Sequence, residues 1–330
     1  MSRKRSRSWP TPLPVSAQVY APRALVTGDP RDATLGIAHY LCVPQDHVLR
    51  GMADGIAAIR REFAAHVQAL RARGDAASAT RARDDELCLR YVLDQEAGSL
   101  PVLFPHEYLM MDCDEHGNLL PERRSAATGR GMELAEFAAH ASARGSRLTE
   151  AHVAALRLYT SHAYQSINEP MRDVARFRAG RPHPLPVTVA LIDDAAKKLK
   201  HASSGTATAW QPRPLYRGMR DIALPADFRA HGGTELAPMS ATFSLDTAVR
   251  FATGGQRATV MRIHNVDWTT RGADLRFLSC YPSEEESLFA PLTFLRYRPP
   301  ADGAAPPTVT TQSGVVFDVV DVETQQIASA

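Results

Sequence analysis

The segment SEEESLFAPLTFLRY (residues 283–297) places three consecutive glutamates directly before a run of apolar and aromatic residues. Side chains alternate along a strand, which predicts that Glu284 and Glu286 lie on one face and Glu285 on the other. Two neighbouring carboxylates repel each other, and the repulsion raises the proton affinity of one of them. A solvated acidic turn is the simpler interpretation, but the apolar run indicates the start of a buried strand.

A second polar pattern lies in PMSATFSLDTAVRFA, residues 238–252, where small hydroxyl side chains fall within a short strand. Ser240 and Thr242 are two residues apart, so a strand places them on one face. Small hydroxyls of this kind can orient a carboxylate by hydrogen bonding. The segment then continues as a helix, in which Ala248 and Phe251 are expected to pack inward. Taken alone, the pattern also fits an ordinary strand with a hydroxyl face.

Further upstream, LYRGM (residues 215–219) ends a short apolar strand with Arg217, which is followed by Gly218. An arginine beside a glycine can approach a phosphate closely and bind it with two parallel hydrogen bonds. An exposed salt bridge is the more ordinary role of such an arginine. The motif therefore gains meaning only together with the two others.

Helical patterns are followed along the chain by strand-like patterns, and this order predicts an α+β fold. Apolar residues spaced three and four apart predict a helix over about 46–70, and a second helix over 80–95 would form a hairpin with it. From residue 215 onward, short apolar runs separated by Gly, Pro and Asp predict strands. Further helices are expected over 132–143, 148–172 and 187–200.

In this order and spacing, the three motifs resemble those of the Arg-Ser-Glu class of mono-ADP-ribosyltransferases, over about residues 146–330. That family has an aromatic-Arg-Gly strand, a Ser-Thr-Ser-like strand followed by Ala and Phe, and a Glu-x-Glu before a short apolar strand. Ala241, Thr242 and Ser287 depart from the family's residues, whereas the catalytic positions are kept. The matching segments are Tyr216-Arg217-Gly218, Ser240-Ala241-Thr242 with Ala248 and Phe251, and Glu284-Glu285-Glu286.

A fourth segment, residues 148–172, resembles the first helix of that family. Tyr159, Asn168 and Arg172 fall on the positions that line the dinucleotide pocket there. Pro170 is unusual so near the end of a helix and predicts a kink that affects the placement of Arg172.

The resemblance implies that NAD is the substrate. It implies that Glu286, oriented by Ser240, hydrogen-bonds the nicotinamide ribose and stabilises the positive charge that develops as the glycosidic bond breaks. Glu284 would accept a proton from the attacking side chain. In the family, a glutamate at this position is associated with arginine acceptors, so transfer of ADP-ribose to an arginine is expected.

The resemblance also implies binding roles and a fold. Arg217 would hold a phosphate of NAD, with help from Arg172. Tyr159 and Asn168 would position the dinucleotide, and Tyr281 matches the loop aromatic that contacts the target protein. The implied catalytic fold consists of two packed antiparallel-type β-sheets with flanking helices.

The 330 residues have the composition of a globular protein, with 44% hydrophobic and 22% charged residues. The net charge of +2 gives no argument for a nucleic-acid partner. The four scattered cysteines lack a CxxC pair and predict free thiols in a reducing compartment. Residues 108–120 look like the start of a calcium loop, but Arg123 stands where a bidentate glutamate is needed. A hairpin turn at 116–118 is predicted instead, and no metal is expected.

Residues 1–35 are basic and rich in Arg, Ser and Pro, and they are predicted to form a disordered leader that serves as a secretion signal. No stretch of about 18 apolar residues or apolar signal region occurs, so neither a membrane span nor Sec-type export is expected. Residues 36–130 are expected to form a mainly helical region for chaperone binding or localisation, ahead of a catalytic domain at 146–330. Together with the resemblance, these features predict a bacterial effector or toxin, secreted without a Sec signal, that modifies a host protein in the host cytoplasm.

Two alternatives remain open from the sequence. An NAD glycohydrolase would use water as the acceptor, and Tyr281 and Glu284 favour a protein acceptor over it. A non-enzymatic binding module on a degenerate transferase fold is the other alternative. The intact Arg217, Ser240 and Glu286 argue against such a module.

Overall fold

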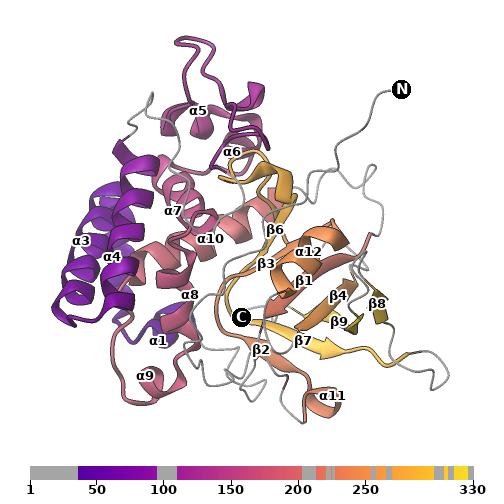
Figure 1. Cartoon of the computed structure of the whole chain (residues 1–330). Coiled ribbons are helices and arrows are strands. Elements are labelled where there is room, and N and C mark those ends of the chain that lie inside the picture. Colours follow the sequence, from indigo (N-terminus) through magenta and orange to yellow (C-terminus); the bar gives the residue numbers. More distant parts are fainter. Residues whose placement is uncertain are drawn as a thin grey trace, which may run out of the picture.

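The computed structural model shows a helical N-terminal part that leads into a strand-rich C-terminal part, which is the predicted α+β order (Figure 1). The predicted leader at 1–35 lies outside the described residues. Those residues are 36–94, 110–202, 213–220, 224, 227–253, 258–264, 270–300, 308–310 and 316–325.

The described helices are concentrated before residue 203, and two shorter ones lie among the strands. They are α1 (Ile37–Leu41), α2 (Gln45–Asp54), α3 (Ile56–Ala72), α4 (Ala76–Leu89), α5 (Leu134–Ala139), α6 (Ala141–Gly145), α7 (Glu150–Thr160), α8 (Tyr164–Arg172), α9 (Val174–Arg178), α10 (Pro186–Ala202), α11 (Phe228–His231) and α12 (Leu245–Ala252).

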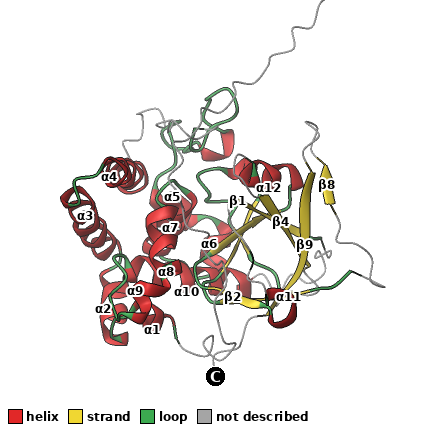
Figure 2. Ribbon diagram, turned by 60° about the horizontal axis from the view of Figure 1, so that its bottom comes forward, coloured by secondary structure: helices red, strands yellow, loops and turns green. Residues whose placement is uncertain are grey.

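Three predicted helices are each divided in two. The helix expected over 46–70 breaks between α2 and α3 at Gly55, whose φ of +59° is a left-handed value that interrupts helical hydrogen bonding. The helix expected over 132–143 is α5 and α6, and the one expected over 148–172 is α7 and α8. The α3–α4 hairpin is confirmed, and the two helices lie side by side (Figures 1 and 2).

The N-terminal helices share a hydrophobic core with the predicted catalytic domain. Side chains of α1, α2 and α3 belong to the same buried cluster as those of α7, α10 and β6. The Glu62 carboxylate on α3 also accepts hydrogen bonds from the first amides of α10, at 2.7 Å from Val187 N and 3.0 Å from Thr188 N. The apolar face of these helices is therefore covered inside the molecule, and a role of residues 36–130 in chaperone binding or localisation stays a prediction.

The described strands form one nine-stranded sheet in the order β2-β7-β9-β4-β1-β3-β6-β5, with β8 paired to β9. Among the strand pairs of the described residues, only β4–β9 is parallel. The strands are β1 (Leu215–Arg220), β2 (Gly233–Glu235), β3 (Met239–Thr242), β4 (Ala258–His264), β5 (Ala273–Asp274), β6 (Glu286–Phe289), β7 (Thr293–Tyr297), β8 (Thr308–Thr310) and β9 (Val316–Gln325).

The predicted catalytic fold of β-strands with flanking helices is confirmed, and its two groups of strands are linked in one sheet. Strands β3, β6 and β5 join the other strands through β1 and β3, which are paired only at Tyr216 and Thr242. The two halves also pack against different partners. Residues of β5 and β6 join the helical core, whereas β1 and β4 are covered by α12 (Figure 2). The narrow junction therefore brings the ends of β1, β3 and β6 together.

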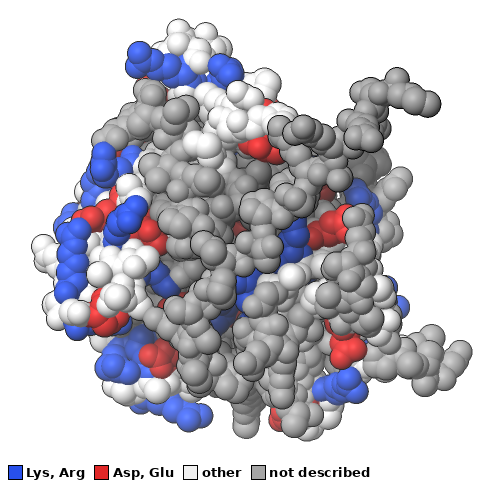
Figure 3. All heavy atoms as spheres, in the orientation of Figure 1, with Lys and Arg blue, Asp and Glu red and all other residues white. Residues whose placement is uncertain are grey.

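Charges of both signs are interspersed on the face shown in Figure 3, including the α3–α4 side at the left. Exposed ion pairs there include Arg71–Glu86 at 2.6 Å and Arg60–Asp94 at 2.5 Å. Each such pair contributes at most about 1 kcal/mol to stability. Within the described residues, none of the helices combines the length and hydrophobicity that crossing a membrane requires.

Candidate active site

Three neighbouring strands bring the predicted catalytic side chains together. In the register of β3 with β6, Thr242 pairs with Glu286, while β1 lies on the other side of β3. The Arg217 guanidinium donates a hydrogen bond to the carbonyl oxygen of Ser240 at 2.7 Å, and the Ser240 hydroxyl donates to the Glu286 carboxylate. The predicted interaction of Ser240 with Glu286 is therefore present in the structure.

Helix α7 contacts the strand that carries Ser240 through Tyr159. The Tyr159 hydroxyl lies 2.8 Å from Ser240 Oγ and donates to the carbonyl of Pro238 at 3.1 Å. Tyr159 is buried in the last turn of α7, a helix with mostly buried residues, and this packing limits its movement. It therefore holds the strand that carries Ser240, in addition to any contact with a substrate.

The Glu286 carboxylate is the central group of the site, and its residue is 7% exposed. One oxygen accepts from Ser240 Oγ, and the other accepts from Ser279 Oγ at 3.4 Å. Burial raises the pKa of Glu286 to about 7, against the opposing effects of both serine hydrogen bonds and of the Arg217 charge. The site thus contains a buried carboxylate that changes its charge near neutral pH.

Two arginines meet beside this carboxylate on a second buried acid, Glu235 at the end of β2. Arg172 binds Glu235 in bidentate geometry, at 3.0 Å and 3.2 Å, and Arg217 Nη2 lies 3.8 Å from the same carboxylate. Burial works against the charge of Arg172, yet the charge of Glu235 raises the pKa of Arg172 above its ordinary value. Two guanidiniums and one carboxylate leave one surplus positive charge, which suits an anion such as a diphosphate.

Two buried polar atoms in this group lack a hydrogen-bond partner within the described part of the chain. They are Nε of Arg217, a donor, and Oδ1 of Asn168, an acceptor. Leaving such atoms unpaired costs about 1–3 kcal/mol each. A ligand that offers both a phosphate oxygen and a hydrogen-bond donor would satisfy them, and NAD has both.

Gly218 is needed for packing. A Cβ at this position would overlap the carbonyl oxygen of Ala248, because α12 lies directly across β1. The structure thus gives this glycine a packing role, and the close approach of Arg217 to a phosphate stays a prediction. Ala248 is buried as predicted, but Phe251 is 44% exposed, which corrects its predicted inward position.

The family model for NAD:arginine ADP-ribosyltransferases matches residues 121–299. The chain belongs to this family. The match contains β1, β3 and β6 with all the residues of the site, and it begins before residue 146, the predicted start of the catalytic domain. The predicted ADP-ribosyltransferase resemblance is therefore confirmed.

Several solved structures resemble this ADP-ribosyltransferase family member, although none of the curated proteins matches it. The Vis toxin from Vibrio splendidus is 20% identical and covers 60% of this chain and 84% of its own, with a TM-score of 0.40. HopU1 of Pseudomonas syringae is 19% identical and covers 58% and 88%, with a TM-score of 0.39. Exoenzyme S from Pseudomonas aeruginosa is 20% identical and covers 57% and 80%, with a TM-score of 0.36.

The three glutamates of this transferase-family motif do not alternate along one strand. Strand β6 begins at Glu286, residues 282–284 form a 3-10 turn, and Glu285 has a left-handed φ of +49°. The expectation that Glu284 and Glu286 share a strand face is corrected accordingly. Thr242 Oγ1 donates to the carbonyl of Glu284 at 2.6 Å, which ties this turn to β3.

Tyr281 is 5% exposed and belongs to the helical core. Contact of this ring with a target protein stays a prediction. The turn before it is formed by short polar contacts, including Tyr281 N to Ser279 Oγ at 3.1 Å.

The predicted hairpin turn at 116–118 is present. Asp114 accepts hydrogen bonds from the amides of His116 and Asn118, at 2.8 Å and 2.9 Å, and Cys113 pairs with Leu119. Gly117 adopts a left-handed φ of +80°. In the described ranges, no group of three or more His, Cys, Asp or Glu side chains is arranged to hold a metal ion.

Sequence reasoning missed Glu235, Ser279 and Asp112. Glu235 is buried between two arginines, and Ser279 contacts the catalytic glutamate. Asp112 was considered only as part of a calcium-like pattern, whereas it binds two buried arginines. The one available signal was charge placement, because an acid in an otherwise apolar strand needs a buried partner.

Proposed function

We propose that this protein transfers ADP-ribose from NAD to the arginine side chain of a protein and releases nicotinamide. The observation that carries the proposal is a buried carboxylate, Glu286, hydrogen-bonded by Ser240 and adjacent to two arginines with a surplus positive charge. This combination supplies one group for a cationic sugar and another for a diphosphate. Family membership supports the reaction class.

Glu286 acts where positive charge develops. Breaking the bond between nicotinamide and ribose leaves an oxocarbenium-like sugar, and a fixed carboxylate stabilises that charge without reorganising in the transition state. Ser240 and Ser279 hold one oxygen each, which fixes the orientation of the carboxylate. Arg217 and Arg172 would hold the diphosphate, and Tyr159 and Asn168 would position the dinucleotide.

The rate should depend on the charge of Glu286. Because its pKa is raised to about 7 from 4.5, the folded state keeps a proton that the unfolded state loses between these pH values. The contribution of Glu286 to stability therefore falls as pH rises through this window, whereas activity rises because the reaction needs the carboxylate. We expect kcat/KM for nicotinamide release to increase through about pH 7. A flat profile from roughly pH 5 to roughly pH 9 would contradict this assignment.

Glu284 is proposed as the base that prepares the acceptor. The guanidinium of arginine has a very high pKa, so its attack requires removal of a proton. We expect Glu284→Ala to lower transfer to an arginine-bearing protein by about 10²–10⁴-fold, with nicotinamide release by hydrolysis changed by less than about threefold. Parallel assays of label transfer and nicotinamide release measure this split. Equal losses in both assays would refute the separate roles of Glu284 and Glu286.

The direct test incubates the purified protein with labelled NAD and a cell lysate, and it follows both protein labelling and free nicotinamide. Labelling that hydroxylamine removes in the manner of an arginine linkage supports the proposal. Nicotinamide release without labelling would favour an NAD glycohydrolase, the second candidate, which is supported by the burial of Tyr281. The absence of both labelling and nicotinamide release would favour a binding module.

We also propose that the protein is secreted and that its target lies in the cytoplasm of a host cell. The four cysteines support a reducing site of action, because all of them are free and three are buried. Labelled bands from a host lysate, identified by mass spectrometry, would name the target.

A further inference from the structure

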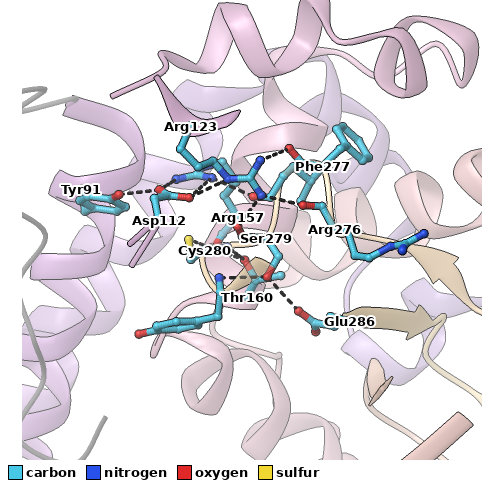
Figure 4. Close-up of polar contacts among 12 residues, drawn as sticks. Tyr91, Asp112, Arg123, Arg157, Thr160, Arg276, Phe277, Ser279, Cys280 and Glu286 are labelled. Atoms are coloured by element: carbon cyan, nitrogen blue, oxygen red, sulfur yellow. Dashed lines mark hydrogen bonds and ion pairs between the residues drawn. The ribbon is translucent and has the colours of Figure 1, made fainter. Parts of the chain in front are cut away.

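The loop that precedes the catalytic glutamate is held by side chains from a distant part of the chain. The carbonyl oxygens of five consecutive residues, 276–280, all accept hydrogen bonds from outside the loop, as Figure 4 shows for much of this network. These bonds are Arg123 Nη2 to Arg276 O at 2.6 Å and to Ser279 O at 3.2 Å, Arg123 Nη1 to Phe277 O at 2.8 Å, Arg157 Nη1 to Leu278 O at 2.8 Å, and Asp112 N to Cys280 O at 2.7 Å.

The two arginines are themselves fixed by one carboxylate. Asp112 binds Arg123 Nε at 3.1 Å and Arg157 Nη2 at 2.6 Å, and it accepts a hydrogen bond from the Tyr91 hydroxyl at 2.5 Å. All three charged side chains are buried. The Arg157 guanidinium also lies 4.1 Å from the ring centre of Phe137. Side chains held in this way cannot move independently of one another.

Packing on the other side of the loop is incomplete. A cavity of about 730 Å³ borders Arg276 and Phe277, and Arg123 also lines it. Among the described residues, the Phe277 ring stacks on His140 at the edge of this space, with ring centres 4.8 Å apart, and also packs against the helical core. The hydrogen bonds from Arg123 act together with this packing and fix the backbone carbonyls of the loop.

The loop position reaches the catalytic carboxylate through Ser279. Its carbonyl accepts from Arg123, and its hydroxyl donates to Glu286 at 3.4 Å (Figure 4). Because Arg123 fixes the backbone of Ser279 and the Ser279 side chain contacts Glu286, a shift of Arg123 would also shift the hydroxyl that contacts Glu286. At 3.4 Å, a small displacement of the loop is enough to break the bond to Glu286.

We propose that Arg123 is a positioning residue for the transferase reaction: it fixes the loop 276–280 so that Ser279 keeps Glu286 in its productive orientation. This inference rests on the proposed function. It makes the segment around Asp112 and Arg123 part of the catalytic unit, although the sequence placed both outside the predicted domain at 146–330.

The first test replaces Arg123 with Met, which keeps the length of the side chain and removes its donors. We expect kcat for nicotinamide release to fall by about tenfold or more, because a small displacement of a catalytic group is costly. KM for NAD should stay within about twofold, since Arg217 and Arg172 are not affected. Arg124→Met, the exposed neighbour, is the matched control and should retain its rate. A larger change in KM than in kcat for Arg123→Met would overturn the proposal.

The second test asks whether Arg123 acts through Ser279. In a double-mutant cycle, Arg123→Met should cost clearly less in a Ser279→Ala background than in the wild type. Both single variants should also move the acid limb of the pH profile to higher pH. Ser279→Ala removes a hydrogen bond that lowers the pKa of Glu286, and Arg123→Met displaces the residue that donates it. If the rate losses of the two variants are independent and the acid limb of the pH profile does not move, Arg123 has a purely structural role. Arg123→Lys, which keeps one donor group, should recover part of the rate.

Hydrogen exchange separates this inference from the proposed function. In the folded Arg123→Met protein, amides of residues 278–280 should exchange faster, whether or not the enzyme is active. Inactivity of the wild type would refute the proposed function and, with it, the catalytic role of Arg123. If the wild type is active and amide exchange at residues 278–280 is unchanged in Arg123→Met, the positioning role of Arg123 is refuted and the proposed function stands.

Discussion

Glu286→Gln is expected to lower nicotinamide release and protein labelling together, by about 10³-fold. The substitution keeps the shape of the side chain and an oxygen that can accept from Ser240, but it removes the negative charge that the oxocarbenium-like sugar requires. Initial rates with labelled NAD measure the effect. Folding should be preserved, because burial already disfavours the charge of Glu286, and above about pH 7 the neutral amide avoids that cost.

A neighbouring glutamate provides the control for this experiment. Glu285→Gln removes a charge one residue away, from a partly exposed residue in the turn before β6. We expect its rates to stay within about threefold of the wild type. Near-normal activity of Glu286→Gln, with an intact fold, would show that the site assignment is wrong.

Asp112→Ala should cause the largest loss of stability, about 3–5 kcal/mol. Its carboxylate binds two buried guanidiniums, and removing it leaves both charges in the interior without a counter-charge. Removing one partner of a buried ion pair lowers stability far more than replacing both partners with apolar residues, because the remaining charge is desolvated and unpaired. Urea denaturation of the full chain gives the free energy of unfolding.

Asp114→Ala is the matched comparison for this measurement. Asp114 lies two residues away and caps the exposed turn at 116–118, where it accepts backbone amides. We expect its loss to cost about 1 kcal/mol. Equal costs for the two variants would mean that Asp112 does not carry the buried network.

Local patterns were sufficient for part of the site. Arg217, Ser240 and Glu286 each follow a strand or helix signal, and the strands that carry them turn out to be neighbours in the sheet. The same patterns were misleading where the chain turns. The alternation rule assumed a continuous strand that includes Glu284. Glu285 has a left-handed φ, however, and the strand begins only at Glu286, two residues after Glu284.

Buried charge partners were beyond any local pattern. Arg172 was placed in a nucleotide pocket by resemblance, yet its partner Glu235 is 63 residues away. Arg123 served only to exclude a calcium loop, whereas in the structure it contacts a carbonyl 154 residues further along the chain. Nothing in the periodicity of either segment indicates such a partner, because periodicity reports only which face of an element is apolar.

The sequence by itself determined the order of helices and strands, the family, and the residues that carry the proposed chemistry, because hydrophobic periodicity and short motifs are local properties of the chain. Only the tertiary structure decided how these residues are held. It showed that Glu235 joins the two arginines, that Ser279 contacts Glu286, and that the N-terminal region and the catalytic strands share one core. The physical reason is that a buried charge needs a partner of opposite sign, and folding can bring that partner from any distance along the chain.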